Sequence, residues 1–170
     1  MNALIRPEQP GDELGIAEVN LAAFGSPREA ALVDELRKVA DPFISFVADL
    51  DRKVVGHILF TPVLIRGEHE RSDAIGLGPM AVHPDHQRCG IGSELVRAGL
   101  QECARRAHPV VFVLGHPEYY PRFGFRPAPP LGLRFRSPDF DPAFMVAELV
   151  PGALSDRKGW VEYLPAFDEV

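Results

Sequence analysis

The chain has 170 residues, enough for one globular domain with its own core, and 46% of them are hydrophobic. Its formal net charge of −6 argues against non-specific nucleic-acid binding, which requires a basic surface. No apolar run approaches the ~20 residues of a membrane span, and no secretory signal precedes Pro7. The two cysteines, Cys89 and Cys103, do not form a disulfide framework. We therefore expect a cytoplasmic protein without nucleic-acid or membrane partners.

The N-terminal part of the chain predicts one strand, two helices and a strand pair. Asp12 is expected to cap the first helix and Gly25 to end it. Ser26-Pro27 starts the second helix, with proline at a first-turn position. The expected strands lie at residues 3–6, 43–48 and 54–60, and residues 49–53 form the turn between the last two.

The rest of the chain predicts a longer strand, a central helix and two more strands. The elements in order are a hairpin tip at 66–73, a strand at 74–82, a helix ended by His108-Pro109, a buried strand at 110–114, a loop-like segment at 126–142, a strand at 144–149 and an irregular tail at 151–170. This order predicts a mixed α/β sheet with helices on both faces. We expect a single domain over residues 1–170, with its core in residues 1–150.

A glycine-rich turn at residues 87–92 carries the strongest chemical signal. Gln87-Arg88-Cys89-Gly90-Ile91-Gly92 follows a strand-like run and opens a helix-like one. Glycines allow a tight turn and close approach of a ligand to the backbone. The first N–H groups of a helix point out of its end, where the helix dipole is positive. The sequence therefore predicts a phosphate site here, although a simple helix-packing turn remains an alternative.

Two other nucleotide motifs fit less well. The turn is not a P-loop, because no Gly-Lys-Ser/Thr is present. Residues 76–81 match the letters of a dinucleotide fingerprint, G-x-G-x-x-A. However, strand residues and then Pro84 follow this match, where a helix should begin.

Two motifs together resemble the GNAT N-acetyltransferases. Gln87-x-x-Gly90-x-Gly92 matches the family's Q/R-x-x-G-x-G/A signature, and the preceding residues 80–84 resemble the strand that leads into it. Tyr120-Pro121-Arg122-Phe123-Gly124-Phe125 resembles the family's second element, a tyrosine on a short helix before a Gly-Phe pair. The order of elements up to about residue 150 also fits. The chain looks most like a bacterial subgroup of poorly defined substrate.

The resemblance implies a GNAT-like, mostly antiparallel sheet that is splayed near the cofactor. It implies transfer of an acetyl group from acetyl-CoA to an amine, which is a small molecule or a peptide. The acceptor would lie beside residues 24–28 and the 126–142 segment, and a homodimer is allowed because many relatives are dimers. The implied diphosphate contacts are Gln87, Arg88, Cys89, Gly90, Ile91, Gly92 and Ser93. The implied backbone contacts to the pantetheine arm and thioester are Met80, Ala81 and Val82.

Tyr120 is the implied catalytic residue, with Tyr119 as its competitor. A phenol of pKa about 10 does not fully protonate a thiolate of pKa about 8.5, so we expect a hydrogen bond to the leaving group. The general base stays open, as does relay through water. The candidate bases are Glu68, Glu70, Asp73, His57 and Glu118, with His57 also typical of a buried structural histidine. His83-Pro84-Asp85-His86 lacks further ligands at metal-site spacing, so we expect no metal.

Two other functions remain open from the sequence. One is an acyl-CoA-binding sensor or interaction module without catalysis. The other is a nucleotide-dependent oxidoreductase that uses residues 76–81. The sequence alone does not fix the acceptor or the length of the acyl chain.

Overall fold

The computed structural model describes residues 2–170, so Met1, part of the expected domain, lies outside the described residues. These residues divide into two compact units. Unit 1 comprises residues 2–61, 78–102 and 165–170, and unit 2 comprises residues 62–77 and 103–164. Strands β3 (Lys53–Arg66) and β4 (Arg71–Val82) each contribute residues to both units.

Unit 1 is built from helices packed on antiparallel strands. Besides parts of β3 and β4, its elements are β1 (Leu4–Pro7), α1 (Glu13–Phe24), α2 (Arg28–Val39), β2 (Ile44–Leu50), the short 3₁₀ helix η1 (Pro84–His86), most of α3 (Ile91–Arg105) and η5 (Pro165–Glu169). Strand β2 lies between β1 and β3 and is antiparallel to both. The C-terminal turn η5 packs on α2.

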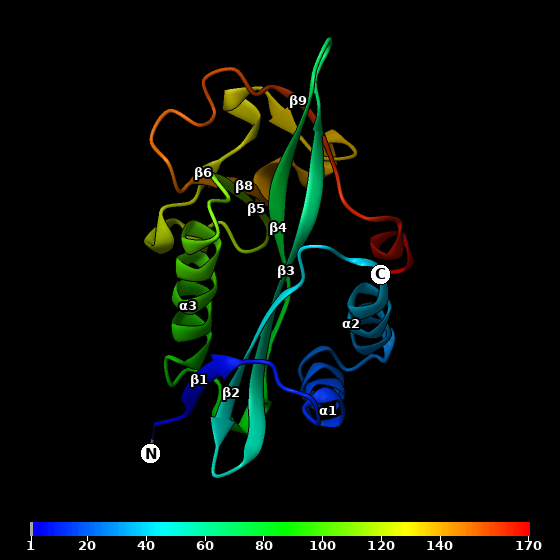
Figure 1. Cartoon of the computed structure of the whole chain (residues 1–170), viewed down its shortest axis with the longest axis vertical. Coiled ribbons are helices and arrows are strands. Elements are labelled where there is room, and N and C mark those ends of the chain that lie inside the picture. Colours follow the sequence, from blue (N-terminus) through cyan, green and yellow to red (C-terminus); the bar gives the residue numbers. More distant parts are fainter. Residues whose placement is uncertain (1) are drawn as a thin grey trace. The chain divides into compact units, whose positions relative to one another are not determined.

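Helices cover both faces of β3 within unit 1 (Figure 1). A Cβ on Gly56 would lie 3.1 Å from Ile91 and Leu95 of α3. The next residue, His57, contacts Asn20 of α1. Neighbouring residues of a strand point to opposite faces, so α1 and α3 lie on opposite sides of β3. The predicted layer arrangement is confirmed.

The start of α1 differs from the prediction. Asp12 does not cap the helix with its side chain. Its carboxylate instead accepts hydrogen bonds from the Arg6 guanidinium at 2.8 and 3.0 Å and from the Gln9 N–H at 2.7 Å. These bonds hold the pKa of Asp12 below its ordinary value, with the Arg6 bond as the largest cause. Gly25 ends the helix in a left-handed conformation, as predicted.

Unit 2 has its own apolar core around three aromatic rings. Its strands and turns, beyond β3 and β4, are β5 (Val110–Leu114), η2 (Tyr120–Phe123), β6 (Arg126–Pro127), η3 (Pro129–Leu131), β7 (Leu133–Arg134), η4 (Pro138–Ala143), β8 (Phe144–Glu148) and β9 (Gly159–Glu162). Phe112 and Phe144 stack with ring centroids 5.3 Å apart, and Phe135 stacks on Phe144 at 5.6 Å. These rings fix β5, β8 and the β7 segment around one core.

The strand order confirms the predicted mixed, mostly antiparallel sheet. Hydrogen-bonded neighbours follow the order β1-β2-β3-β4-β5-β8-β6, and β9 pairs with β3 and β7. The pairings β4–β5 and β7–β9 are parallel, whereas β5–β8, β6–β8 and β3–β9 are antiparallel. None of the helices in residues 2–170 combines the length and the apolar character needed to cross a membrane.

Two segments are more regular than predicted. The hairpin tip is shorter than residues 66–73, because β3 extends to Arg66 and β4 begins at Arg71. The tail expected to be irregular contains β9, whose register runs from Leu64↔Glu162 to Arg66↔Trp160. The tail strand depends on a partner about 100 positions away, which local sequence patterns do not reveal.

Candidate functional site

The glycine turn in unit 1 is an exposed loop with an unusual backbone. Arg88 and Gly90 have φ values of +62° and +88°. A Cβ on Gly90 would meet nothing within 4 Å, so the backbone conformation, rather than a lack of space, favours glycine there. The Gln87 side chain donates a hydrogen bond to the Val82 carbonyl at 2.9 Å and closes the loop onto β4. Residues 87–90 are exposed, as a ligand site requires.

The loop runs directly into the first turn of α3. The first hydrogen bond of the helix joins the Glu94 N–H to the Gly90 carbonyl at 3.1 Å, so the amides before Glu94 point out of the helix end. Ile91 is buried, and with Leu95 it packs against Gly56 of β3. A fixed helix end with a positive dipole can hold an anion.

Strand β4 changes character after Leu77. Its parallel register with β5 runs from Ile75↔Val111 to Leu77↔Val113 and includes none of the described residues from Gly78 to Val82. Gly78 has a φ of +146°, and Pro79, which follows it through a cis peptide bond, has no N–H to donate. The three predicted backbone contacts follow this irregular pair: Ala81 is buried, and Met80 and Val82 are half-buried.

Two alternatives from the sequence find no support in these residues. Residues 76–81 all lie within β4, and no helix begins there, so the dinucleotide fingerprint is absent. His83 uses Nδ1 to accept the Asp85 N–H at 3.1 Å, which makes it the cap of η1. Across residues 2–170, no three His, Cys, Asp or Glu side chains gather as a metal site would need.

Tyr120 lies in unit 2 at the start of η2, with only 6% of its surface exposed. Its ring occupies the space beside Gly115, where a Cβ would lie 2.4 Å from Cε2. Phe125 packs edge-on against it at 5.6 Å, and Tyr119 does so at 5.1 Å. Burial, with a smaller contribution from Tyr119, raises the pKa of Tyr120 to about 12. The hydroxyl therefore stays protonated and is a donor at neutral pH.

A second buried phenol escaped the sequence analysis. The Tyr163 ring packs on Gly76 of β4, where a Cβ would lie 2.8 Å from Cε2. Burial and the neighbouring Tyr120 both raise the pKa of Tyr163. The local sequence contained no clear signal for this contact, because Tyr163 follows β9, which forms by pairing with the distant strands β3 and β7.

His57 is a structural residue rather than an accessible base. It is fully buried, and burial, more than the charge of Arg37, lowers its pKa to about 3. Its Nδ1 lies 3.3 Å from Asn20 Nδ2, and its Nε2 lies 3.0 Å from Ser45 Oγ. The Ser45 hydroxyl donates to Glu8, which also accepts from Arg37 Nε at 2.8 Å. Both ring nitrogens are thus occupied inside the protein.

The other candidate bases are all exposed side chains of unit 2. Glu68 and Glu70 lie at the β3–β4 hairpin tip (top of Figure 1), closed by a bond from the Gly67 N–H to the Glu70 carbonyl. Asp73 follows on β4, and Glu118 precedes η2. At about 3.3 Å per residue, seven residues place Glu70 roughly 23 Å from Leu77 along β4. The two tip glutamates are therefore remote from the end of the β4–β5 pairing.

The arginines that follow Tyr120 in the sequence have partners within unit 2. Arg126 pairs with Glu148, and Arg134 pairs with Asp141 at 2.6 Å. Arg122 lies over the Tyr119 ring at 4.7 Å.

Comparison with known proteins identifies a family and several relatives. A model of the acetyltransferase (GNAT) domain matches residues 4–128. The uncharacterised N-acetyltransferase YhbS of Escherichia coli K12 is 36% identical over 166 residues, which is 97% of this chain and 98% of YhbS. The crystal structure of E. coli YhbS in complex with CoA superposes on this chain with a TM-score of 0.91, and the match covers 99% of this chain and 93% of the YhbS chain.

Two further relatives agree. The uncharacterised N-acetyltransferase YjhQ of E. coli K12 is 42% identical over 118 residues, or 68% of this chain, and the match spans 65% of YjhQ. A GNAT family acetyltransferase from Brucella melitensis, solved with acetyl-CoA, is 35% identical with a TM-score of 0.80, and the match covers 97% of each chain. With its fold, its glycine turn and these relatives in agreement, the chain belongs to the GNAT family of N-acetyltransferases.

Proposed function

We propose that this protein transfers an acetyl group from acetyl-CoA to an amine by direct attack in a ternary complex. The observation that carries this proposal is the exposed turn at residues 87–90, closed onto β4 and continued by the anchored first turn of α3. Two relatives with matching folds were solved with CoA or acetyl-CoA. The proposed diphosphate contacts are Gln87, Arg88, Cys89, Gly90, Ile91, Gly92 and Ser93.

The proposed contacts for the pantetheine arm and the thioester are backbone groups of Met80, Ala81 and Val82. The β4–β5 register ends at Leu77, and Gly78, with its positive φ, and Pro79, which has no N–H, come just before these residues. An N–H aimed at the oxygen that becomes negative during acyl transfer lowers the barrier by about 3 kcal/mol.

Tyr120 is the proposed hydrogen-bond donor to the departing thiolate. With a pKa of about 12, its phenol lies about 3.5 units above a thiol of pKa near 8.5, a gap of about 5 kcal/mol against full proton transfer. Donation of a hydrogen bond avoids most of that cost. The acceptor amine loses its proton to a base other than His57. Relay through water can remove that proton without a dedicated side chain.

Matched glycine variants test the cofactor site. Gly90→Ala places an alanine at φ +88°, and Gly11→Ala places one at φ +102°, with nothing within 4 Å of either new Cβ. Both changes carry a similar backbone strain of about 1–2 kcal/mol. Isothermal titration with acetyl-CoA should show weakened binding for Gly90→Ala and unchanged binding for Gly11→Ala. Equal affinities for both variants and the wild type would remove the turn from the cofactor site.

Turnover over a panel of amines, followed by loss of thioester absorbance, tests the transfer itself. Consumption of acetyl-CoA that depends on an amine supports the enzyme. Tight binding without consumption on any amine of the panel would instead identify an acyl-CoA sensor.

A further inference from the structure

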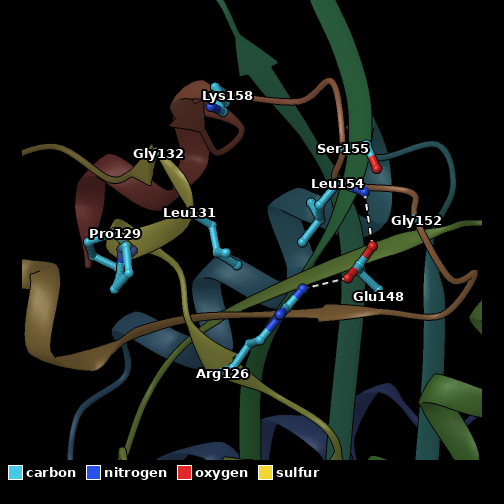
Figure 2. Close-up of a pocket in the computed structure, with 10 residues that line it drawn as sticks. Arg126, Pro129, Leu131, Gly132, Glu148, Gly152, Leu154, Ser155 and Lys158 are labelled. Carbon is cyan, nitrogen blue, oxygen red and sulfur yellow. Dashed lines mark hydrogen bonds and ion pairs between the residues drawn. The ribbon is translucent and has the colours of Figure 1, made fainter.

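Unit 2 contains a polar cavity that belongs to none of the residues discussed as the cofactor site. Its volume is about 600 Å³, within the range of small-molecule sites. Three segments build it: residues 126–132, the end of β8, and the turns at 152–158 (Figure 2). Its lining residues are Arg126, Pro129, Pro130, Leu131, Gly132, Glu148, Gly152, Leu154, Ser155 and Lys158.

The carboxylate of Glu148 is already used by the cavity wall. One oxygen accepts Arg126 Nη2 at 2.5 Å, and the other accepts the Leu154 N–H at 3.1 Å, as the dashed lines of Figure 2 show. Arg126 thereby neutralises the charge of Glu148, while about half of the Arg126 side chain stays exposed. Glu148 acts as a fixed support for Arg126 and Leu154 rather than as a free acceptor.

Lys158 lies at the edge of the cavity, and no carboxylate among residues 2–170 forms an ion pair with it. A Cβ on Gly132 would lie 3.2 Å from Lys158 Cγ and Cδ, so the aliphatic stem rests on that glycine. The next residue, Gly159, donates its N–H to the Gly132 carbonyl at 2.8 Å, which fixes the backbone beside Lys158. With two cations and one carboxylate, the lining has a formal charge of +1 in a chain of net charge −6.

We propose that this cavity binds a small organic anion, with its acid group on Lys158 and its apolar body on Pro129, Leu131 and Leu154. Charge-assisted hydrogen bonds from Lys and Arg are the strong contacts to carboxylates. The proline and leucine surfaces favour an apolar body over a bare inorganic ion. The anion is either the acid group of the amine acceptor or a separate effector.

Direct binding tests the site without acetyl-CoA, so its outcome is independent of the proposed transfer reaction. The probe is hippurate, a carboxylate on a benzamide body, and the neutral control is hippuramide. Lys158→Gln should weaken hippurate binding about fivefold at low salt, the effect of one exposed charge contact. Lys53→Gln removes an exposed lysine at the start of β3 and should leave binding unchanged.

Three results would each overturn the proposal. They are no hippurate binding at millimolar concentration, equal binding of hippurate and hippuramide, and equal effects of Lys158→Gln and Lys53→Gln on hippurate binding. Steady-state kinetics then shows whether the bound anion is the acid group of the acceptor or a separate effector. If the acid group belongs to the acceptor, Lys158→Gln raises KM for phenylalanine and not for phenylalaninamide. If the anion is an effector, hippurate changes turnover of phenylalaninamide in the wild type and not in Lys158→Gln.

Discussion

Replacement of Tyr120 by phenylalanine removes one hydroxyl from an otherwise preserved cluster of rings. The ring is 6% exposed and stays packed on Gly115, Phe125 and Tyr119, so the variant should fold. A hydrogen bond to a charged group contributes about 1.5–3 kcal/mol. If that bond forms to the thiolate in the transition state, its loss should lower kcat by about 10- to 150-fold. The affinity for acetyl-CoA should change less than twofold.

The same variant should leave the pH profile of turnover unchanged in shape. Burial raises the pKa of Tyr120 to about 12, so the phenol keeps its proton through neutral and mildly alkaline pH. Tyr120 therefore adds no alkaline limb to kcat below about pH 11. A limb in this range that disappears in Tyr120→Phe would show that the phenol ionises and works as a base or proton donor.

The assay combines loss of thioester absorbance with calorimetric binding of acetyl-CoA, and Tyr119→Phe is the matched control. Tyr119 lies on the same turn, is half-buried and has Arg122 over its ring. Its variant should retain nearly full kcat. Equal losses of kcat and of acetyl-CoA affinity in Tyr120→Phe, or a larger fall of kcat in Tyr119→Phe, would refute the assigned role.

Three further changes test the packing that supports the site. Gly115→Ala should lower kcat about as much as Tyr120→Phe, because its Cβ would lie 2.4 Å from the Tyr120 ring; unchanged turnover would contradict that placement. Gly99→Ala should cost about 1–3 kcal/mol of stability and lower Tm by about 5 °C, because its Cβ would lie 1.9 Å from Phe60; an unchanged melting curve would refute this contact. His57 stays neutral when folded, with a pKa of about 3, whereas in the unfolded chain it takes up a proton below about pH 6.5. Stability should therefore fall as pH falls, by roughly 3 kcal/mol from this residue between pH 7 and 4.5, and His57→Gln should reduce that dependence in urea titrations; an identical slope would argue against the buried neutral ring.

Elements with strong local patterns were predictable from the sequence. The apolar run at 110–114 became β5, and the glycine turn was followed by α3 at Ile91. Periodicity and glycine spacing act over a few residues, so they are readable without tertiary information. The loop at residues 87–90 is exposed and has positive φ values at Arg88 and Gly90, in line with the tight turn that its glycine-rich sequence indicated.

Features set by distant partners were not predictable. Asp12 was predicted to cap α1, but its carboxylate accepts hydrogen bonds from Arg6 and from the Gln9 N–H instead. The strand at 159–162 exists because β3 and β7 offer it hydrogen bonds. Tyr163 reaches Gly76 only because that strand forms. Such contacts depend on which segments meet in three dimensions, which a local pattern does not encode.

The two cysteines differ in a way that is useful at the bench. Neither forms a disulfide in residues 2–170, Cys103 is buried in the protein, and Cys89 is exposed on the glycine turn. A maleimide reagent should therefore modify the native protein at one position only. If CoA occupies the turn as proposed, the rate of that alkylation, followed by mass spectrometry, should fall with increasing CoA. The same exposure means that disulfide-based thiol reagents would react with the protein as well as with released CoA.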